Sequence, residues 1–207
     1  MHPQDGPCFS IEDIEIDDKK TVYDGFFSLQ RYKLRHRLIE GGWSKPLVRE
    51  CLHRPAAVAV LLYDPHQDSV VLLKQFRVGA LEAQDGPWQL ELVAGLLEPG
   101  ESSEEVAHRE SVEEAGAKIT ALEFICDFYS SAGGSDETIT LYCGHINAGG
   151  LGGVHGLEEE GEDIWVQVFS RKDAMSALTE NIINNAPAII ALQWLQTHWQ
   201  RLQQQWQ

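Results

Sequence analysis

The sequence has few cysteines, few basic residues and no long apolar run. Its four cysteines are scattered along 207 residues, with no CxxC pair and no Cys/His cluster (Cys8, Cys51, Cys126, Cys143). This spacing disfavours a zinc site and a disulfide framework. No apolar segment approaches the roughly 20 residues that span a bilayer, and the N-terminus lacks the basic and apolar regions of a secretory signal. We therefore expect a cytoplasmic protein with reduced thiols and no membrane partner.

Basic residues are half as numerous as acidic ones. Lys and Arg total 16, whereas Asp and Glu total 32, so the formal net charge is −16. Such a surface argues against nucleic acid as a partner, because nucleic-acid binding needs basic patches. An anionic substrate would require metal cations to compensate the repulsion.

Hydrophobic patterning divides the chain near residue 54. Residues 21–51 alternate loosely and indicate two or three exposed strands within an N-terminal β region, residues 1–54. From residue 55 to 207 the pattern is that of a second domain. Apolar runs there predict strands at 57–63, 70–76, 88–93, 119–128, 138–143 and 164–169.

Helices are expected between and after these strands. Ser102 and Glu105 have capping-box spacing at the start of a helix over 102–115, and Gly116 stands where a left-handed C-cap belongs. Two further helices follow Ser170 and Asn185, and the last carries an apolar stripe from 189 to 206 that indicates core or dimer packing. The fold class is therefore α/β or α+β with a mixed sheet.

The helix over 102–115 gathers three carboxylates on one face. Glu110 and Glu114 are four residues apart, and Glu113 flanks the same face. Like charges at this spacing repel, and the helix dipole disfavours anions near the C-terminal end. A hard cation such as Mg²⁺ would compensate them. The alternative is a solvated acidic face that Arg109 partly neutralises.

A glycine loop precedes this helix. Gly95 and Gly100 bracket a tight loop after a buried strand, and Glu101 lies eight residues before Arg109. An ion pair between Glu101 and Arg109 would hold the loop against the helix and leave the three glutamates facing a cleft. A strand, a glycine loop and an acidic helix in this order can place carbonyl and carboxylate oxygens around metal ions that act on a diphosphate.

These residues resemble a known motif. The pattern Gly95-x5-Glu101-x7-Arg109-Glu110-Ser111-Val112-Glu113-Glu114-Ala115-Gly116-Ala117 resembles the Nudix box, G-x5-E-x7-R-E-U-x-E-E-x-G-U, in which U is usually bulky and apolar. All the fixed residues are present, whereas Ser111 and Ala117 are small for U positions. The resemblance implies the Nudix fold, an α/β/α sandwich with a mixed sheet.

The resemblance extends from about residue 17 to 206 and is greatest to the bacterial ADP-ribose pyrophosphatases. The segments that carry it are 23–29, 48–50, 75–77, 91–95, 131–135, 158–164 and 184–186. That family hydrolyses ADP-ribose to AMP and ribose 5-phosphate with Mg²⁺, and Mn²⁺ is a possible substitute. It typically forms homodimers that exchange their N-terminal strands.

The resemblance also implies roles for individual residues. The metal ligands would be the Ala94 carbonyl, Glu110, Glu114 and Glu162. Glu113, beside them, would be a catalytic residue, and Gly95, Glu101, Arg109 and Gly116 would be structural in the motif. Glu160, in an acidic loop that Gly161 renders mobile, would orient or deprotonate the attacking water. The substrate-binding residues would be Phe26 and Arg49 at the adenine, Arg77 at phosphate or ribose oxygens, and Ser131 and Glu137 from the partner subunit.

Several alternatives remain open from the sequence. Arg49 and Arg77 could each form an exposed salt bridge, and residues 158–163 could be a solvated acidic turn. The substrate could be another nucleoside-diphosphate sugar or a dinucleotide, because the box reads only the diphosphate. A non-catalytic ADP-ribose sensor is the alternative from another class, although a sensor is expected to lose box glutamates that this chain keeps.

Overall fold

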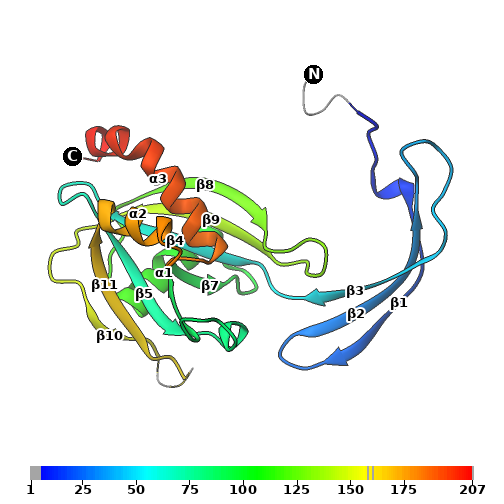
Figure 1. Ribbon diagram of the computed structural model, residues 1–207, viewed down its shortest axis with the longest axis horizontal. Coiled ribbons are helices and arrows are strands. Elements are labelled where there is room, and N and C mark those ends of the chain that lie inside the picture. Colours follow the sequence, from blue (N-terminus) through cyan, green and yellow to red (C-terminus); the bar gives the residue numbers. More distant parts are fainter. Residues whose placement is uncertain (1–5, 158, 160, 207) are drawn as a thin grey trace. The chain divides into compact units, whose positions relative to one another are not determined.

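Two units can be distinguished in the computed structural model, which describes residues 6–157, 159 and 161–206 (Figure 1). The first unit comprises Met1–Arg54 and Tyr129–Glu137, and the second comprises Pro55–Phe128 and Thr138–Gln207. The segment Tyr129–Glu137 was not expected to join the N-terminal strands.

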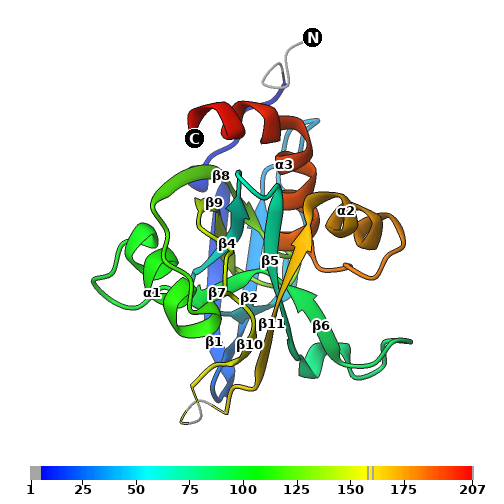
Figure 2. The same cartoon turned by 90° about the vertical axis from the view of Figure 1, so that its left-hand side faces the viewer.

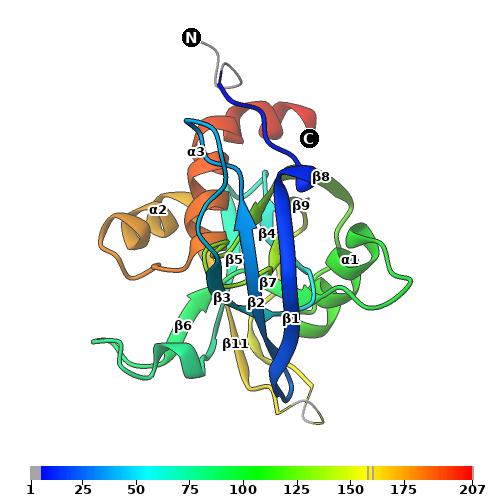
Figure 3. The same cartoon turned by 90° about the vertical axis from the view of Figure 1, so that its right-hand side faces the viewer.

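The first unit is a three-stranded antiparallel sheet in the order β1-β2-β3 (Figure 3). Its strands are β1 (Ile14–Asp24), β2 (Ser28–His36) and β3 (Leu47–His53), preceded by the 3₁₀ turn η1 (Ile11–Asp13). Not one residue of these three strands is buried. The loop 129–137 joins the end of β3, because Leu52 N–H donates to the Gly134 carbonyl at 2.8 Å.

A mixed sheet forms the centre of the second unit. Among the described residues its order is β10-β11-β5-β4-β9-β8, with β6 paired to β5 and β7 paired to β4. Strands β4 and β9 run parallel, and the other pairs with a known register are antiparallel. The bounds are β4 (Ala57–Asp64), β5 (Ser69–Phe76), β6 (Trp88–Glu91), β7 (Val93–Leu96), β8 (Ala121–Tyr129), β9 (Thr138–His145), β10 (Gly153–His155) and β11 (Ile164–Ser170).

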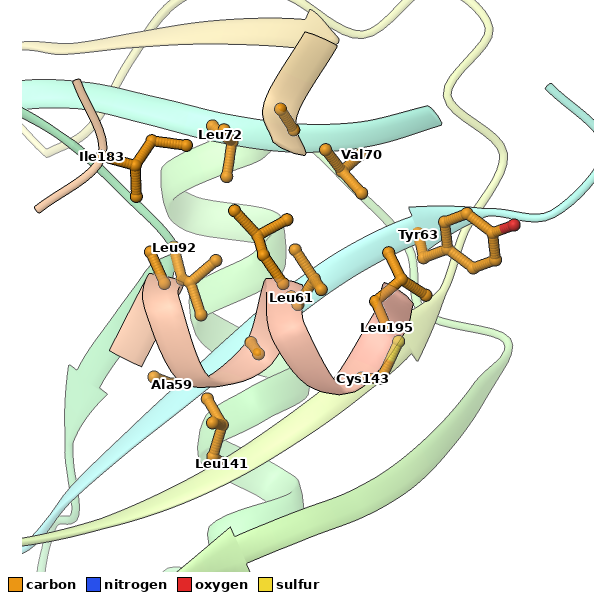
Figure 4. Packing of buried hydrophobic residues seen from close by; sticks show 14 of the residues in the cluster. Ala59, Leu61, Tyr63, Val70, Leu72, Leu92, Leu141, Cys143, Ile183 and Leu195 are labelled. Atoms are coloured by element: carbon orange, nitrogen blue, oxygen red, sulfur yellow. The ribbon is translucent and has the colours of Figure 1, made fainter. Parts of the chain in front are cut away.

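Helices cover both faces of this sheet (Figure 2). Helix α1 (Ser103–Ala115) lies on one face, and α2 (Arg171–Thr179) and α3 (Ala186–Gln205) lie on the other. Alternate residues of the strands therefore enter two separate cores. Leu61 and Leu72 pack against Leu195 of α3 (Figure 4), whereas Val60 and Leu73 pack with the residues of α1.

The expected α/β fold with a mixed sheet is confirmed, and the helix caps are those that the sequence predicts. Ser102 and Glu105 form a reciprocal capping box, and Gly116 ends α1 at φ 62°. Ser170 caps α2 through the Asp173 N–H, and Asn185 caps α3.

Two expectations about strands were wrong in detail. The single strand expected at 88–93 is divided at Leu92 into β6 and β7, since the first part pairs with β5 and the second with β4. Strand β10 was missed because it has only three residues and begins with Gly153. No helix in the described part of the chain is long and apolar enough to cross a membrane.

The small residues at the two U positions are buried, and the hydroxyl among them is hydrogen-bonded. Ser111 is fully buried, and its hydroxyl donates to the Ala107 carbonyl at 2.7 Å. Ala117 is 1% exposed. Both U positions are therefore buried although their side chains are small. The Ser111 hydroxyl is satisfied by a carbonyl of its own helix.

Candidate active site

Glu114 is a buried carboxylate at the junction of α1 and β7. It is 2% exposed, and its Oε2 accepts a hydrogen bond from the Ala94 N–H at 2.9 Å. Burial raises the pKa of Glu114 to about 8, and the charges of Glu110 and Glu162 act in the same direction. Three of the predicted metal ligands therefore lie close enough to influence one another electrostatically.

Glu110 lies directly against the backbone of β7. A Cβ added to Gly95 would fall 1.8 Å from Glu110 Oε1, so only glycine leaves room for this carboxylate. Burial raises the pKa of Glu110, and the adjacent Arg109 guanidinium opposes that shift. Gly95 has no positive φ, so the motif needs glycine here because the Glu110 carboxylate approaches the backbone closely.

Arg109 contacts every acidic residue expected around it. It forms a bidentate pair with Glu101, with Nε–Oε1 at 3.0 Å and Nη2–Oε2 at 3.1 Å. Its Nη1 also donates to Glu110 at 2.8 Å and to Glu113 at 3.0 Å. We expected Arg109 to hold the loop, with partial neutralisation of the glutamates as the alternative, and it does both: among the described residues it forms the ion pairs that α1 makes.

Glu162 lies in the loop between β10 and β11. Its Oε2 accepts from the Leu157 N–H at 3.1 Å, and its N–H donates to the Leu157 carbonyl at 3.2 Å. Gly161 in this loop has φ 71°, a conformation that favours glycine. Glu160, the predicted base, lies outside the described residues, and so does its neighbour Glu158.

The donor set fits a hard cation, although the carboxylates now bind other partners. Among described residues, no three His, Cys, Asp or Glu side chains are gathered closely enough to hold a metal ion. Glu110, Glu114 and Glu162 instead accept hydrogen bonds from Arg109, Ala94 and Leu157. Oxygen donors, a glycine cradle and a buried carboxylate nevertheless match what Mg²⁺ or Mn²⁺ binding needs, and a bound cation would offset the repulsion that helps to raise the pKa of Glu114.

Arg77 directly follows β5 and forms an ion pair with Glu91 of β6. Its Nε donates to Glu91 Oε2 at 2.7 Å, so the ion-pair alternative is realised for this residue. Burial raises the pKa of Glu114, and the positive charge of Arg77 opposes part of that rise, so the guanidinium acts on the acidic site. The sequence did not predict Glu91 as the partner of Arg77.

Phe26 and Arg49 lie in the first unit and are open to solvent. Phe26 is 87% exposed, and its ring centre is 4.8 Å from that of Phe27 in an edge-on arrangement. Arg49 donates to the Val48 carbonyl and forms no ion pair with a described residue. The salt bridge considered for Arg49 is therefore not present in the described chain.

Ser131 and Glu137 belong to the loop 129–137 of the first unit. The Ser131 carbonyl accepts from Gly134 and Ser135 in a tight turn. Glu137 is 6% exposed and pairs with Arg54, with Nη2–Oε1 at 3.0 Å. Arg54 also stacks over the Phe27 ring at 4.4 Å, a contact that the sequence did not indicate.

Comparison with known proteins decides the family. The NUDIX domain family matches residues 53–192 of this chain. This chain belongs to the Nudix family. The matched residues contain the whole of the box motif and of β4 to β11.

Three Nudix relatives illustrate the range of similarity. A protein of Haemophilus influenzae named ADP-ribose pyrophosphatase is 46% identical over 96% of this chain and 93% of its own length. A protein of the same name from Escherichia coli K12 is 44% identical over 96% and 95%. A GDP-mannose pyrophosphatase of Cronobacter sakazakii is 33% identical over 88% and 95%.

A solved structure supports the fold. The chain titled "Crystal structure of ADP compounds hydrolase" superposes with a TM-score of 0.68, at 22% identity, covering 92% of this chain and 98% of that chain. At this identity the likeness shows the fold alone.

Proposed function

We propose that this Nudix protein is a divalent-metal-dependent hydrolase that cleaves the diphosphate of ADP-ribose to AMP and ribose 5-phosphate. The observation that carries the hydrolase proposal is the buried Glu114 carboxylate beside Glu110 and Glu162. Repelling carboxylates are expected where cations bind and an anionic substrate follows. The substrate proposal rests on the two relatives named ADP-ribose pyrophosphatase, which are similar over nearly the whole chain.

The proposed metal ligands are the Ala94 carbonyl and the side chains of Glu110, Glu114 and Glu162. All are oxygen donors, which favours Mg²⁺ and permits Mn²⁺. When bound, such a metal neutralises charge on the diphosphate and lowers the pKa of a coordinated water.

The remaining residues bind and orient the substrate in this proposal. Arg77 offers its two Nη groups, which have no described partner, to phosphate or ribose oxygens. Glu113 stays beside the ligands, bonded to Arg109. Glu160 is proposed as the residue that orients or deprotonates water, from the resemblance alone.

The adenine contacts are proposed for the first unit. Phe26 supplies an exposed ring for stacking. Arg49 supplies a guanidinium that forms no ion pair with a described residue. Ser131 and Glu137 would complete the site from a partner subunit in a homodimer. An uncovered β1-β2-β3 sheet supports such a dimer, and the cytoplasmic location stays a prediction.

Product analysis tests the function directly. The protein is incubated with ADP-ribose, GDP-mannose and a flavin dinucleotide, with Mg²⁺ or with EDTA, in ¹⁸O-labelled water. We expect AMP and ribose 5-phosphate from ADP-ribose with Mg²⁺ and no products with EDTA. Turnover in EDTA, or preference for another substrate, contradicts the proposal, and the label shows which phosphorus is attacked.

A second candidate substrate is GDP-mannose, favoured by the relative of that name at 33% identity. The box residues do not discriminate between the two, since they act on the diphosphate. An ADP-ribose sensor would bind ADP-ribose without forming products in the same experiment.

A further inference from the structure

Gln75, near the end of β5, is buried without a hydrogen bond. It is 6% exposed, and its Nε2 has no partner among the described residues. Buried amide donors are almost always satisfied in folded proteins, because an unpaired one is costly. The Gln75 donor is therefore available to an acceptor that is not part of the described protein.

Gln75 lies on the face of the sheet that carries α1. Leu73, two residues earlier on the same strand, packs with Val106 and Ala107 of α1. Side chains alternate along a strand, so Leu73 and Gln75 share this face. Gln89 lies opposite Gln75 in the β5–β6 ladder and shares the face as well.

Arg77 extends the same row of side chains toward the acidic site. Its backbone is still extended, with φ −132° and ψ 114°, and its N–H donates to the Pro87 carbonyl at 2.8 Å. Its side chain forms an ion pair with Glu91, which lies opposite Leu73 in the β5–β6 ladder. Because Gln75 lies between Leu73 and Arg77 along the chain, the Arg77 side chain passes Gln75 to reach Glu91. An open groove of about 540 Å³ beside this row is lined by Arg77, Gln89 and Glu91 together with Asn184 and Asn185, whereas Gln75 does not itself line it.

Neither carboxylate described next to this row accepts a hydrogen bond from Gln75. Glu91 Oε2 accepts from Arg77, and Glu114 Oε2 accepts from the Ala94 N–H. A ligand that brings its own oxygens would therefore satisfy both the Gln75 amide and the unused Nη groups of Arg77. Phosphoryl oxygens are strong acceptors for such donors.

We propose that Gln75 is a substrate-binding residue whose side-chain N–H donates to a non-bridging oxygen of the substrate diphosphate, beside Arg77. This inference rests on the proposed function, because it assigns a further contact within that reaction. Gln75 differs from an ordinary buried glutamine in that its bond is made only when substrate is present.

The test compares Gln75→Met with a matched control, Ser69→Ala. Ser69 is also on β5, is 5% exposed and has an unpartnered hydroxyl, but it lies at the opposite end of the strand. Both substitutions remove a buried unsatisfied group, so neither is expected to lower Tm. We expect kcat/KM for ADP-ribose to fall roughly 10- to 100-fold in Gln75→Met only, the effect of losing a bond to a charged acceptor.

Two measurements of binding complete the test. Affinity for a non-hydrolysable methylene analogue of ADP-ribose with Mg²⁺ should fall by a similar factor in Gln75→Met. In wild-type protein, the ¹⁵N–¹H resonances of the Gln75 side-chain amide should shift when that analogue is added, a readout that does not depend on how the variant folds.

The outcomes separate this inference from the function on which it rests. A wild-type enzyme that cleaves ADP-ribose, with Gln75→Met within twofold of it and an unshifted Gln75 amide, would overturn the inference alone. A wild-type protein that cleaves no nucleoside diphosphate overturns the proposed function and the inference with it.

Discussion

Glu114 is a buried carboxyl group, and burial without a metal ion disfavours its ionised form. At 2% exposure its carboxylate has one backbone donor and no side-chain donor among the described residues. Replacing Glu114 with Gln keeps the shape and an acceptor for the Ala94 N–H but removes the charge. We expect kcat to fall at least 100-fold and Tm without metal to stay equal or rise, because no anion must then be buried. A Glu114→Gln protein with full activity at saturating Mg²⁺ would disprove the proposed ligation.

The raised pKa of Glu114 also predicts how stability depends on pH. The ordinary value is 4.5, and in the folded protein the pKa is about 8. Between these values the folded state holds a proton that the unfolded state releases, so stability falls as pH rises from about 4.5 to about 8. Above that range both states are ionised and the loss is complete.

Thermal unfolding measures this linkage. In EDTA, the fall in Tm between pH 5.5 and 8.5 should be larger for wild type than for Glu114→Gln, in which this proton is absent. Each kcal/mol corresponds to about 2–4 °C for a chain of this size. Mg²⁺ should raise the wild-type Tm more at pH 8.5 than at pH 5.5, since ligation requires the carboxylate. Equal pH slopes for the two proteins would refute the assigned pKa.

At the scale of elements, β7 and α1 act together through the space that Gly95 leaves. Because an added Cβ would fall 1.8 Å from Glu110 Oε1, Gly95→Ala must displace that carboxylate. We expect activity to fall 10-fold or more and the Mg²⁺ requirement to rise, with no penalty from backbone strain. In the control Gly79→Ala the added Cβ meets no atom within 4 Å, so activity should be retained. Full activity of Gly95→Ala would mean that Glu110 need not lie against β7.

The elements predicted best from the sequence are those with local signals. Helix α1 has a capping box at Ser102 and a left-handed glycine at its end, and both are present in the structure. The division of residues 88–96 into two strands has no such signal, because it depends on which distant strand each part pairs with. The same reason explains why the contacts of Arg77 with Glu91 and of Arg54 with Glu137 were missed: their partners are separated by 14 and 83 residues along the chain (91 − 77 and 137 − 54).

For the whole molecule, the predicted site residues divide between the two units. Phe26, Arg49, Ser131 and Glu137, proposed for substrate recognition, all belong to the first unit, whereas every proposed metal ligand and Arg77 belong to the second. The sequence motif therefore identifies the unit proposed to carry the chemistry, while most residues proposed for recognition come from segments without a motif of fixed spacing.

The first unit also makes the oligomeric state testable. Its strands contain no buried residue, and on one face they expose the apolar side chains of Ile14 at 38% and Ile16 at 52%, which lie opposite His36 and Leu34. An apolar sheet face of this kind needs a cover, and we propose that a second copy of the chain provides it. Light scattering should give twice the chain mass of 23.2 kDa for wild type.

A substitution on β1 should separate the dimer from the fold of the second unit. Ile16→Asp places a charge in the proposed interface and should yield monomers with reduced ADP-ribose turnover, because Phe26 and Arg49 belong to the same unit as Ile16. The control Val154→Asp makes the same kind of change at a residue of β10 that is 72% exposed, and should remain dimeric and active. If wild type is monomeric at micromolar concentration and still cleaves ADP-ribose, each chain carries a complete site, and the proposed contribution of Ser131 and Glu137 from a partner is wrong.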